Sequence, residues 1–361
     1  MRRVNHYCVI LAGGVGSRFW PVSTRSCPKQ FYDILEVGKT LIQQTFVRVF
    51  ELVLLENIFV ITHEDYEPFV YEQLPELPKS NLLLEPFMMN TASSIAYASF
   101  RIQLRDKNAS ILIVPSDHLI TEEKQFYEVL QLAFRKAVQG EHLITLGIKP
   151  RRPDTGYGYI QFVSEDHASP IKKVKAFVEK PSREIAREFL YSGDFLWNSG
   201  IFVWNVRTIL NAFRKHLPEM YETFYRGKGK IGSEEEQTFI RSIFPTLQRI
   251  SIDYGVLEKA DNVYVIFSRF GWSDLGTWGV LYDKVPKDTS GNALMGKKVL
   301  FYEAQNNIVY LKGDKTAIIE GLNDYIVIGT SKALLICRKE KEQEIKRFVN
   351  DLKIERGEEF L

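Results

Sequence analysis

Residues 11–21 read Leu11-Ala12-Gly13-Gly14-Val15-Gly16-Ser17-Arg18-Phe19-Trp20-Pro21, and residues 28–31 read Pro28-Lys29-Gln30-Phe31. The run before them, residues 7–11, is short, apolar and rich in residues that favour β-structure. It predicts a buried strand that ends where the glycines begin. Loops at the carboxyl ends of strands are where open α/β sheets bind ligands. The stretch therefore predicts an α/β fold with a binding loop after its first strand.

The composition of this loop favours a triphosphate as its ligand. Glycine allows positive φ and lets backbone N–H groups approach phosphate oxygens, while Arg18 and Lys29 add positive charge. The loop lacks both the third glycine of a dinucleotide fingerprint and the Gly-Lys-Ser/Thr of a P-loop, which disfavours a Rossmann oxidoreductase. A tight strand-to-helix turn is the structural alternative. The predicted nucleotide-binding residues of the loop are Leu11, Ala12, Gly13, Gly14 and Gly16.

The overall composition is that of a globular protein with room for two domains. Its 361 residues exceed the roughly 250–300 at which single cores stop growing. A net charge of +2, with cations spread along the chain, gives no support for binding nucleic acid or a membrane surface. No apolar run approaches the roughly 18 residues of a membrane span. The three cysteines lack metal-ligand spacing, so we expect reduced thiols and a cytoplasmic location.

The first two-thirds of the chain alternates between strand-like and helix-like segments. This alternation predicts repeated βα units and a mixed, mostly parallel, Rossmann-like sheet covered by helices on both faces. The predicted strands are residues 58–62, 81–85, 110–115 and 142–147. The predicted helices include residues 40–52, 91–104 and 122–138.

The pattern changes beyond about residue 284. Short β-rich runs separated by turn residues predict a small all-β domain, either a β-helix or β-roll or a compact meander. The predicted strands are residues 299–302, 308–311, 317–320, 325–329 and 333–337. Residues 340–354 are charged, with apolar side chains at helical spacing, and predict an amphipathic helix. We therefore divide the chain into a catalytic domain of residues 1–284 and a β-rich domain of residues 285–361.

The glycine loop and the Pro-Lys-Gln-Phe segment resemble the sugar-nucleotide pyrophosphorylase family, in particular its mannose-1-phosphate guanylyltransferase branch. Four further segments resemble motifs of that branch and occur in its order. These are Pro115-Ser116-Asp117-His118, Phe177-Val178-Glu179-Lys180-Pro181, Trp197-Asn198-Ser199-Gly200-Ile201-Phe202 and Trp272-Ser273-Asp274-Leu275-Gly276-Thr277-Trp278.

The resemblance implies a GT-A-like nucleotidyltransferase domain and Mg²⁺-assisted transfer of GMP from GTP to α-D-mannose 1-phosphate. Such a reaction needs no protein nucleophile. The sugar phosphate attacks the α-phosphorus while pyrophosphate leaves, so catalysis rests on positioning and on neutralising charge. Arg18, Lys29, Lys180 and Asp117 are the predicted catalytic residues.

Two aspartates are candidates for holding the metal. Asp117 follows a predicted strand and the turn residue Ser116, and Asp274 follows the predicted strand 263–268. Mg²⁺ often uses one or two carboxylates together with substrate phosphates. The resemblance implies that Asp117 and Asp274 share the ion and that Ser116 lies among the nucleotide-binding residues. An aspartate that caps a turn or helix is the structural alternative for each.

Four residues are candidates for the sugar phosphate. Lys180 lies in a predicted strand-to-helix turn, where a point charge suits a phosphate. An amide such as that of Asn198 can donate and accept at once, which suits vicinal hydroxyls. The resemblance implies that Lys180 contacts the phosphate, that Glu179 and Asn198 contact the sugar, and that Gly158 lines the pocket with backbone. The alternative for Glu179 and Lys180 is a surface ion pair at a helix start, and the alternative for Asn198 is a structural role in a turn.

The residues that recognise the base are harder to predict from the sequence. Glu85, Asn90 and Thr91 resemble a family segment that lies near the nucleotide, and Thr91 also suits the start of a helix. The sequence then departs from the family, with Ser93-Ser94 where small apolar residues are common, and this leaves the preference for guanine open. His118 beside Asp117 raises a further hypothesis of acid–base catalysis, which an already ionised phosphate does not require.

Two other functions are also compatible with the sequence. One is nucleotidyl transfer to a different sugar 1-phosphate or from a different base. The other is a regulatory homologue that binds a nucleotide sugar without catalysis, although Arg18, Lys29, Asp117 and Lys180 are all retained. The β-rich tail with its terminal helix would also suit a homodimer.

Overall fold

The computed structural model describes residues 3–163, 169–296 and 298–357. The chain forms two compact units within them. The first unit takes residues up to 13, residues 45–116 and residues 120–272, and the second takes residues 14–44, 117–119 and those from 273 onward. The proposed domain boundary after residue 284 stays a prediction. In the structure, the loop that follows the first strand belongs to the same compact unit as the C-terminal residues.

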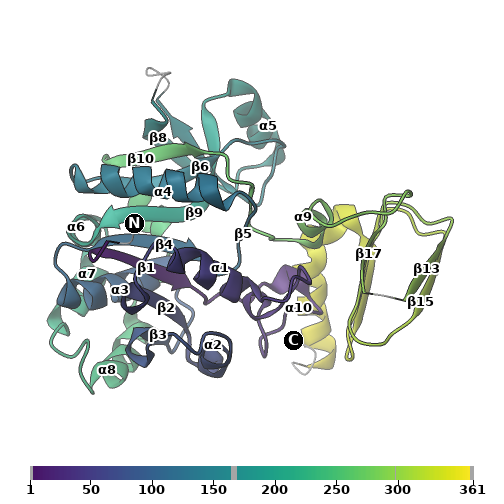
Figure 1. Ribbon diagram of the computed structural model, residues 1–361, viewed down its shortest axis with the longest axis horizontal. Helices are drawn as coiled ribbons and strands as arrows, with labels where there is room; N and C mark the ends of the chain where they lie inside the picture. Colours follow the sequence, from purple (N-terminus) through teal and green to yellow (C-terminus); the bar gives the residue numbers. More distant parts are fainter. Residues whose placement is uncertain (1–2, 164–168, 297, 358–361) are drawn as a thin grey trace. The chain divides into compact units, whose positions relative to one another are not determined.

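The first unit is built on a nine-stranded mixed sheet with the order β3-β2-β1-β4-β9-β6-β10-β8-β7 (Figure 1). Pairing is parallel among β3, β2, β1 and β4 and between β6 and β10, and antiparallel around β9 and β8. The strands are β1 (His6–Leu11), β2 (Ile58–His63), β3 (Leu82–Glu85), β4 (Ser110–Pro115), β6 (Leu143–Ile148), β7 (Gly158–Phe162), β8 (Ile171–Glu179), β9 (Phe195–Asn205) and β10 (Val263–Ser268). The mixed α/β sheet expected from the sequence is confirmed. It is not mostly parallel as predicted, because β9 and β8 pair antiparallel with all their neighbours.

Helices cover both faces of this sheet. Tyr7 and Val9 of β1 belong to a core cluster with apolar residues of α3, α6, α7 and α8, whereas His6, on the alternate face, stacks on Phe134 of α4 at 3.9 Å between ring centroids. The helices are α1 (Leu41–Phe50), α2 (Glu67–Gln73), α3 (Thr91–Arg105), α4 (Glu123–Val138), α5 (Arg183–Ser192), α6 (Val206–His216), α7 (Pro218–Arg226) and α8 (Glu236–Ile243). Two-residue strands, β5 (Leu119–Ile120) and β11 (Trp272–Ser273), lie where the chain passes between the units.

The C-terminal strands of the second unit form a β-helical coil. Strands β12 to β16 alternate between two sheets, β12-β14-β16-β17 and β13-β15, and pair in parallel within each sheet. The last strand, β17, follows β16 in the same sheet and pairs with it antiparallel. This decides between the two alternatives, because a meander would pair neighbouring strands antiparallel. The strands are β12 (Ala293–Met295), β13 (Val299–Tyr302), β14 (Ile308–Leu311), β15 (Ala317–Glu320), β16 (Tyr325–Gly329) and β17 (Leu334–Arg338).

The terminal helix α10 (Ile345–Arg356) packs on the core of the second unit. Ile345 is fully buried in a cluster with Phe19, Trp20 and Trp278 of α9 (Trp278–Tyr282), and Phe348, Val349 and Leu352 pack against that cluster. The predicted amphipathic helix is thus confirmed, although its first turn, Lys339–Glu344, is a 3-10 helix.

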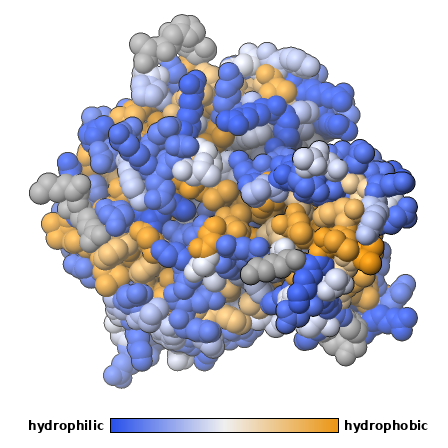
Figure 2. Space-filling model, turned by 45° about the vertical axis from the view of Figure 1, so that its right-hand side comes forward, coloured by the Kyte–Doolittle hydropathy of each residue, from blue (hydrophilic) through white to orange (hydrophobic). Residues whose placement is uncertain are grey.

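Several apolar side chains of the β-coil stay exposed, among them Leu300 and Ile318, which face each other across β13 and β15. Figure 2 shows such apolar surface among hydrophilic side chains on the face that it brings forward. Over the described ranges, no helix combines the length and the apolar character that crossing a membrane requires.

Candidate active site

Leu11 and Ala12, which lead into the glycine turn, continue the pairing of the sheet at the carboxyl end of β1. The Ala12 N–H donates to the Ile61 carbonyl at 2.8 Å, and the Ala12 carbonyl accepts from the Thr62 hydroxyl at 2.8 Å. The Ser116 N–H donates to the Leu11 carbonyl at 3.0 Å. The structure therefore brings the predicted residues Leu11, Ala12 and Ser116 together at the carboxyl ends of β1 and β4.

Glu85 is a buried carboxyl beside this turn. A Cβ at Gly13 would lie 3.7 Å from Glu85 Oε2, and the Ser94 hydroxyl donates to Glu85 Oε1 at 2.7 Å. Burial raises the pKa of Glu85 to about 8, and the hydrogen bond from Ser94 opposes that shift only in part. Ser94 belongs to the segment that departs from the family pattern, so this departure supplies the hydrogen-bond partner of Glu85.

Asn90 and Thr91 form the start of α3. Asn90 has a positive φ of 75°, and its side-chain oxygen accepts from the Thr91 N–H at 2.8 Å. The Thr91 hydroxyl accepts from the Ile252 N–H at 2.9 Å. Both side chains thus hold the N-terminus of α3 in place, and their contact with a nucleotide stays a prediction.

Lys29 is the centre of a buried polar cluster in the second unit. Its side chain is 4% exposed, and its ammonium lies 2.9 Å from Asp117 Oδ2. The same ammonium donates to the main-chain carbonyls of Asp274 at 3.1 Å and Leu275 at 2.9 Å. The Lys29 ammonium therefore contacts both Asp117 and the Asp274 backbone, which are far apart in sequence.

Asp117 is held in its charged form. Burial favours the neutral carboxyl, but the charges of Lys29 and His118 and the hydrogen bond from Lys29 outweigh it, so the pKa of Asp117 lies below its usual range. His118 Nε2 lies 4.0 Å from Asp117 Oδ1, which is too long for a hydrogen bond. The geometry therefore favours an ion-holding carboxylate over an Asp–His acid–base pair.

Gly16 and Arg18 occupy the same loop. Gly16 has a φ of 66°, and a Cβ there would come within 2.7 Å of the Lys29 Cβ, so only glycine fits this close approach. By contrast, nothing lies within 4 Å of a Cβ at Gly14. Arg18 Nε is buried and has no hydrogen-bond partner among the residues that the structure describes. Such an orphaned donor needs an explanation, and an anionic ligand supplies one.

The four candidates for the sugar phosphate lie together in the first unit. Gly158 of β7 is in register with Glu179 of β8, and a Cβ at Gly158 would overlap Glu179 Oε2 and lie 3.5 Å from the Asn198 Cβ. The Lys180 ammonium lies 2.5 Å from Glu179 Oε1, and Lys180 itself has a positive φ of 48°. The absence of a side chain at Gly158 therefore leaves room for the Glu179 carboxylate beside Asn198.

Asp253 is a fifth residue in this group, and sequence reasoning missed it. Asn198 Nδ2 donates to Asp253 Oδ1 at 2.7 Å. Burial, followed by the nearby charge of Glu179, raises the pKa of Asp253 to about 6. The segment Ile252-Asp253-Tyr254 contains one acid beside an apolar residue, which is common at a helix start and gave no distinct signal.

The Asp117 carboxylate beside Lys29 suits a magnesium ion. Asp274 presents its main-chain carbonyl there, and its Oδ1 accepts from the Gly276 N–H at 3.1 Å. Mg²⁺ takes oxygen ligands and is commonly held by one or two carboxylates plus substrate phosphates. Within residues 3–163, 169–296 and 298–357, no three metal-ligating side chains cluster. The second unit instead brings the Asp117 carboxylate and the Asp274 backbone to one cation, Lys29, which suits a site that substrate phosphates complete.

Comparison with known proteins identifies the family of this chain. The nucleotidyl transferase family model matches residues 7–291. The chain belongs to this family. A second model, described as a MannoseP isomerase/GMP-like beta-helix domain, matches residues 297–352. These matches confirm the prediction of a nucleotidyltransferase α/β fold followed by a β-helical C-terminal domain.

Relatives of this nucleotidyl transferase cover nearly the whole chain. The alginate biosynthesis protein AlgA of Pseudomonas aeruginosa is 36% identical over 350 residues, which cover 95% of this chain and 71% of that protein. A mannose-1-phosphate guanylyltransferase of Klebsiella pneumoniae is 34% identical over 358 residues, which cover 98% and 75%. The crystal structure described as a mannose-1-phosphate geranyltransferase from Thermus thermophilus has a TM-score of 0.85 and 30% identity, and covers 97% of this chain and 99% of that one.

Proposed function

We propose that this nucleotidyl transferase converts GTP and α-D-mannose 1-phosphate to GDP-mannose and pyrophosphate. The observation that carries the proposal is the buried Lys29, whose ammonium joins the Asp117 carboxylate to the Asp274 and Leu275 carbonyls. The name of the 34% identical relative from Klebsiella pneumoniae supports the choice of substrates. The reaction forms a bond between a sugar-phosphate oxygen and the α-phosphorus, and breaks the bond from that phosphorus to the β-phosphate oxygen.

Cations of the second unit would stabilise the departing pyrophosphate. The glycine turn offers backbone N–H groups, and Arg18 and Lys29 supply charge near them. Asp117 and Asp274 would hold Mg²⁺, which when bound neutralises phosphate charge. Because Asp117 stays ionised in the protein, it is ready to take a cation in place of its ion pair with Lys29.

The first unit would orient the attacking sugar phosphate. Lys180 supplies a positive charge for the phosphate, while Glu179 and Asn198 present acceptors and a donor to the hydroxyls. Asp253 holds the Asn198 amide through its 2.7 Å hydrogen bond, so we assign it a positioning role. Vicinal hydroxyls are matched by such a set because each can donate and accept.

Glu85 is the residue that we propose for reading the base. Guanine presents two neighbouring donors, N1–H and N2–H₂, which the carboxylate form of Glu85 would accept. These donors would favour that ionised form over the neutral form that burial favours. Adenine presents an acceptor at N1 instead, which an acceptor oxygen repels. Glu85 lies beside Gly13 of the nucleotide loop, and Asn90 and Thr91 follow it closely in the chain.

The three cysteines bear on the cellular location of the protein. Cys8, Cys27 and Cys337 form no disulfide within the described residues, which is usual for a cytoplasmic protein. We therefore infer a cytoplasmic enzyme. The homodimer expected from the C-terminal tail stays a prediction.

The test is pyrophosphate release by purified protein with Mg²⁺, crossing GTP, ATP, UTP and dTTP against the 1-phosphates of mannose, glucose and fucose. We expect release only with GTP and mannose 1-phosphate, and its loss in Asp117→Ala. Asp314→Ala is the matched control, because Asp314 is a fully exposed aspartate of the same unit. Release with a different pair would change the substrate, and binding of nucleotide sugar without release would favour the regulatory homologue.

A further inference from the structure

The ammonium of Lys29 is located by one aromatic ring and two carbonyl groups, in addition to its ion pair with Asp117. The Phe19 ring is fully buried, and its centroid lies 5.3 Å from the ammonium, within the range of a cation–π contact. The same ammonium donates to the carbonyls of Asp274 and Leu275. The position of Lys29 therefore depends on the ring and on the segment that carries these carbonyls.

Helix α9, which follows these carbonyls in the chain, packs against Phe19. Trp278, the first residue of α9, is fully buried, and its ring centroid lies 4.8 Å from that of Phe19. The Trp278 Nε1–H donates to the Trp20 carbonyl at 3.4 Å. A shift of α9 would therefore move both the ring and the carbonyls that surround the Lys29 ammonium.

One carboxylate from the C-terminal region holds the start of α9. Glu342 Oε2 accepts from the Gly279 N–H at 2.8 Å, across 63 positions of the sequence. A carboxylate is a stronger hydrogen-bond acceptor than a neutral oxygen. A Cβ at Gly279 would lie 2.5 Å from Glu342 Oε2, so only glycine leaves room for this contact. Glu342 therefore fixes the first turn of α9.

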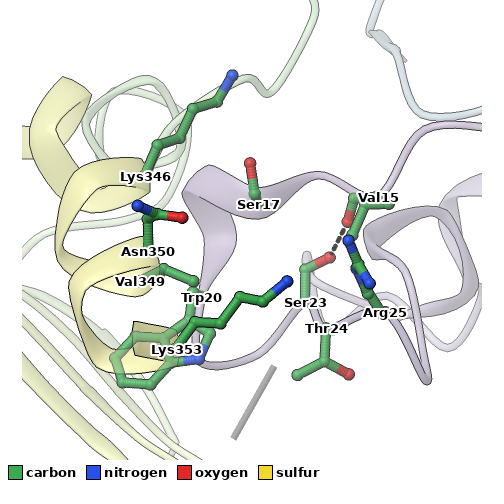
Figure 3. Close-up of a pocket in the computed structure, with 10 residues that line it drawn as sticks. All are labelled: Val15, Ser17, Trp20, Ser23, Thr24, Arg25, Lys346, Val349, Asn350 and Lys353. Carbon is green, nitrogen blue, oxygen red and sulfur yellow. Dashed lines mark hydrogen bonds between the residues drawn. The ribbon is translucent and has the colours of Figure 1, made fainter. Parts of the chain in front are cut away.

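Glu342 itself is held by the fold of the C-terminal region. It lies in the 3-10 turn Lys339–Glu344, which continues into α10. Ile345, the first residue of α10, is fully buried in the same core cluster as Trp20. Figure 3 shows α10 beside the loop that follows the glycine turn, with Val349 next to the Trp20 ring. The turn that carries Glu342 is therefore anchored on the same core as that loop.

We propose that Glu342 is a positioning residue for Lys29. Its carboxylate fixes α9, and α9 fixes the Phe19 ring and the two carbonyls that locate the ammonium. The effect of this position on catalysis rests on the proposed function, in which Lys29 stabilises the departing pyrophosphate. The placement of Lys29 does not rest on it, because that placement follows from contacts within the protein. The C-terminal region thus acts on the phosphate loop through one hydrogen bond.

The experiment measures the rate of reductive methylation of Lys29 in the full chain without substrate, read by mass spectrometry. Lys29 is 4% exposed, so the reagent reaches it only when its surroundings open. In Glu342→Ala we expect about tenfold faster labelling, because a hydrogen bond to a charged group restrains such opening by roughly that factor. Lys172, whose ammonium is buried in the first unit, should keep its rate and so reports on unfolding elsewhere.

Three further variants sharpen this result. Glu342→Gln retains an acceptor oxygen, so its labelling should be slower than that of Glu342→Ala. Glu340→Ala, at an exposed residue of the same turn, is the matched control and should label as wild type. Gly279→Ala should label as fast as Glu342→Ala, because its methyl group displaces the carboxylate, and the double variant should be no faster than either. Gly279→Ala also tests the proposal if Glu342→Ala does not fold.

Pyrophosphate release supplies a second readout. The kcat of Glu342→Ala should fall about tenfold with little change in either KM, because Lys29 acts on the departing group. Labelling of Lys29 at the wild-type rate in both Glu342→Ala and Gly279→Ala would overturn the proposal, whether or not the wild type releases pyrophosphate. Faster labelling in these variants, with no release by the wild type, would support the positioning role and reject the proposed function.

Discussion

Asp117 in the second unit and Asp253 in the first are both partly enclosed carboxyls, and their surroundings push their pKa values in opposite directions. Asp117 lies 2.9 Å from the Lys29 ammonium, and the pKa of its carboxyl falls. Asp253 lies near Glu179 and accepts from Asn198, and its pKa rises to about 6. Burial acts in the same direction on both, so the neighbouring charge decides the outcome.

This difference separates two kinds of binding surface. A cation that keeps a carboxylate charged suits a region for metal and phosphate, where charge must be balanced. Carboxyl and amide groups in close contact suit a region for sugar hydroxyls, where hydrogen bonds carry recognition. Lys29 belongs to the first kind of surface, and Asn198 and Asp253 belong to the second.

The largest effect is expected for Lys29→Ala. Removing the buried cation leaves Asp117 unpaired and takes charge away from the departing pyrophosphate, so kcat/KM should fall about 10²–10³-fold. Steady-state pyrophosphate release measures this, with circular dichroism as a check on folding. Lys39→Ala, a change at an exposed lysine nearby in sequence, should behave as wild type. A folded Lys29→Ala enzyme with normal kcat/KM would remove Lys29 from the mechanism.

A smaller, more selective effect is expected for Asn198→Ala. The variant loses the amide that contacts Asp253 and that we assign to the sugar, so the KM for mannose 1-phosphate should rise roughly 10–100-fold while the KM for GTP changes little. Initial rates with each substrate varied in turn separate the two constants. The control is Asn211→Ala, at an exposed asparagine of α6. Equal increases in both KM values would contradict a sugar-specific role.

The smallest effect is expected for Asp253→Asn, and it concerns stability. Folded Asp253 keeps its proton to about pH 6, whereas the unfolded residue loses it near its ordinary pKa of 3.8. The folded state therefore binds more protons between these values, and wild type loses stability as pH rises through this window. Asparagine can still accept from Asn198 but does not ionise, so the variant should be more stable at pH 7.5 by about 1–2 kcal/mol.

Urea unfolding at pH 4.5 and 7.5 measures this difference. The gap between variant and wild type should be smaller at pH 4.5, where Asp253 is mostly neutral in the folded protein. Asp261→Asn, at an exposed residue, controls for the loss of one surface charge. A gap that does not depend on pH would mean that Asp253 is ionised throughout and that the two carboxyls do not differ as described.

Local patterns were sufficient for most of the fold. Strands β13, β14, β15 and β16 begin and end where the alternation of apolar and turn residues placed them, because strand boundaries there depend on neighbouring residues. The β-helix was only one of two alternatives, since the same runs are compatible with parallel or antiparallel pairing. Pairing depends on contacts between distant residues, which periodicity does not encode.

Residues of the candidate site could be predicted from the sequence only where they belong to short contiguous motifs. Gly158, Glu179, Lys180 and Asn198 were named from separate motifs, and the structure places them together. Asp253 was missed, because a single acid at a helix start is ordinary until Asn198 is seen beside it.

The sequence by itself determined the family, the position of the phosphate loop and most secondary structure, because each depends on residue types at short spacing. Only the tertiary structure decided that Lys29 is buried against Asp117 and the Asp274 backbone, and that Asp253 lies with Asn198 and near Glu179. The physical reason is that charge state and hydrogen bonding depend on distance and burial in space, and folding joins residues that the chain keeps far apart.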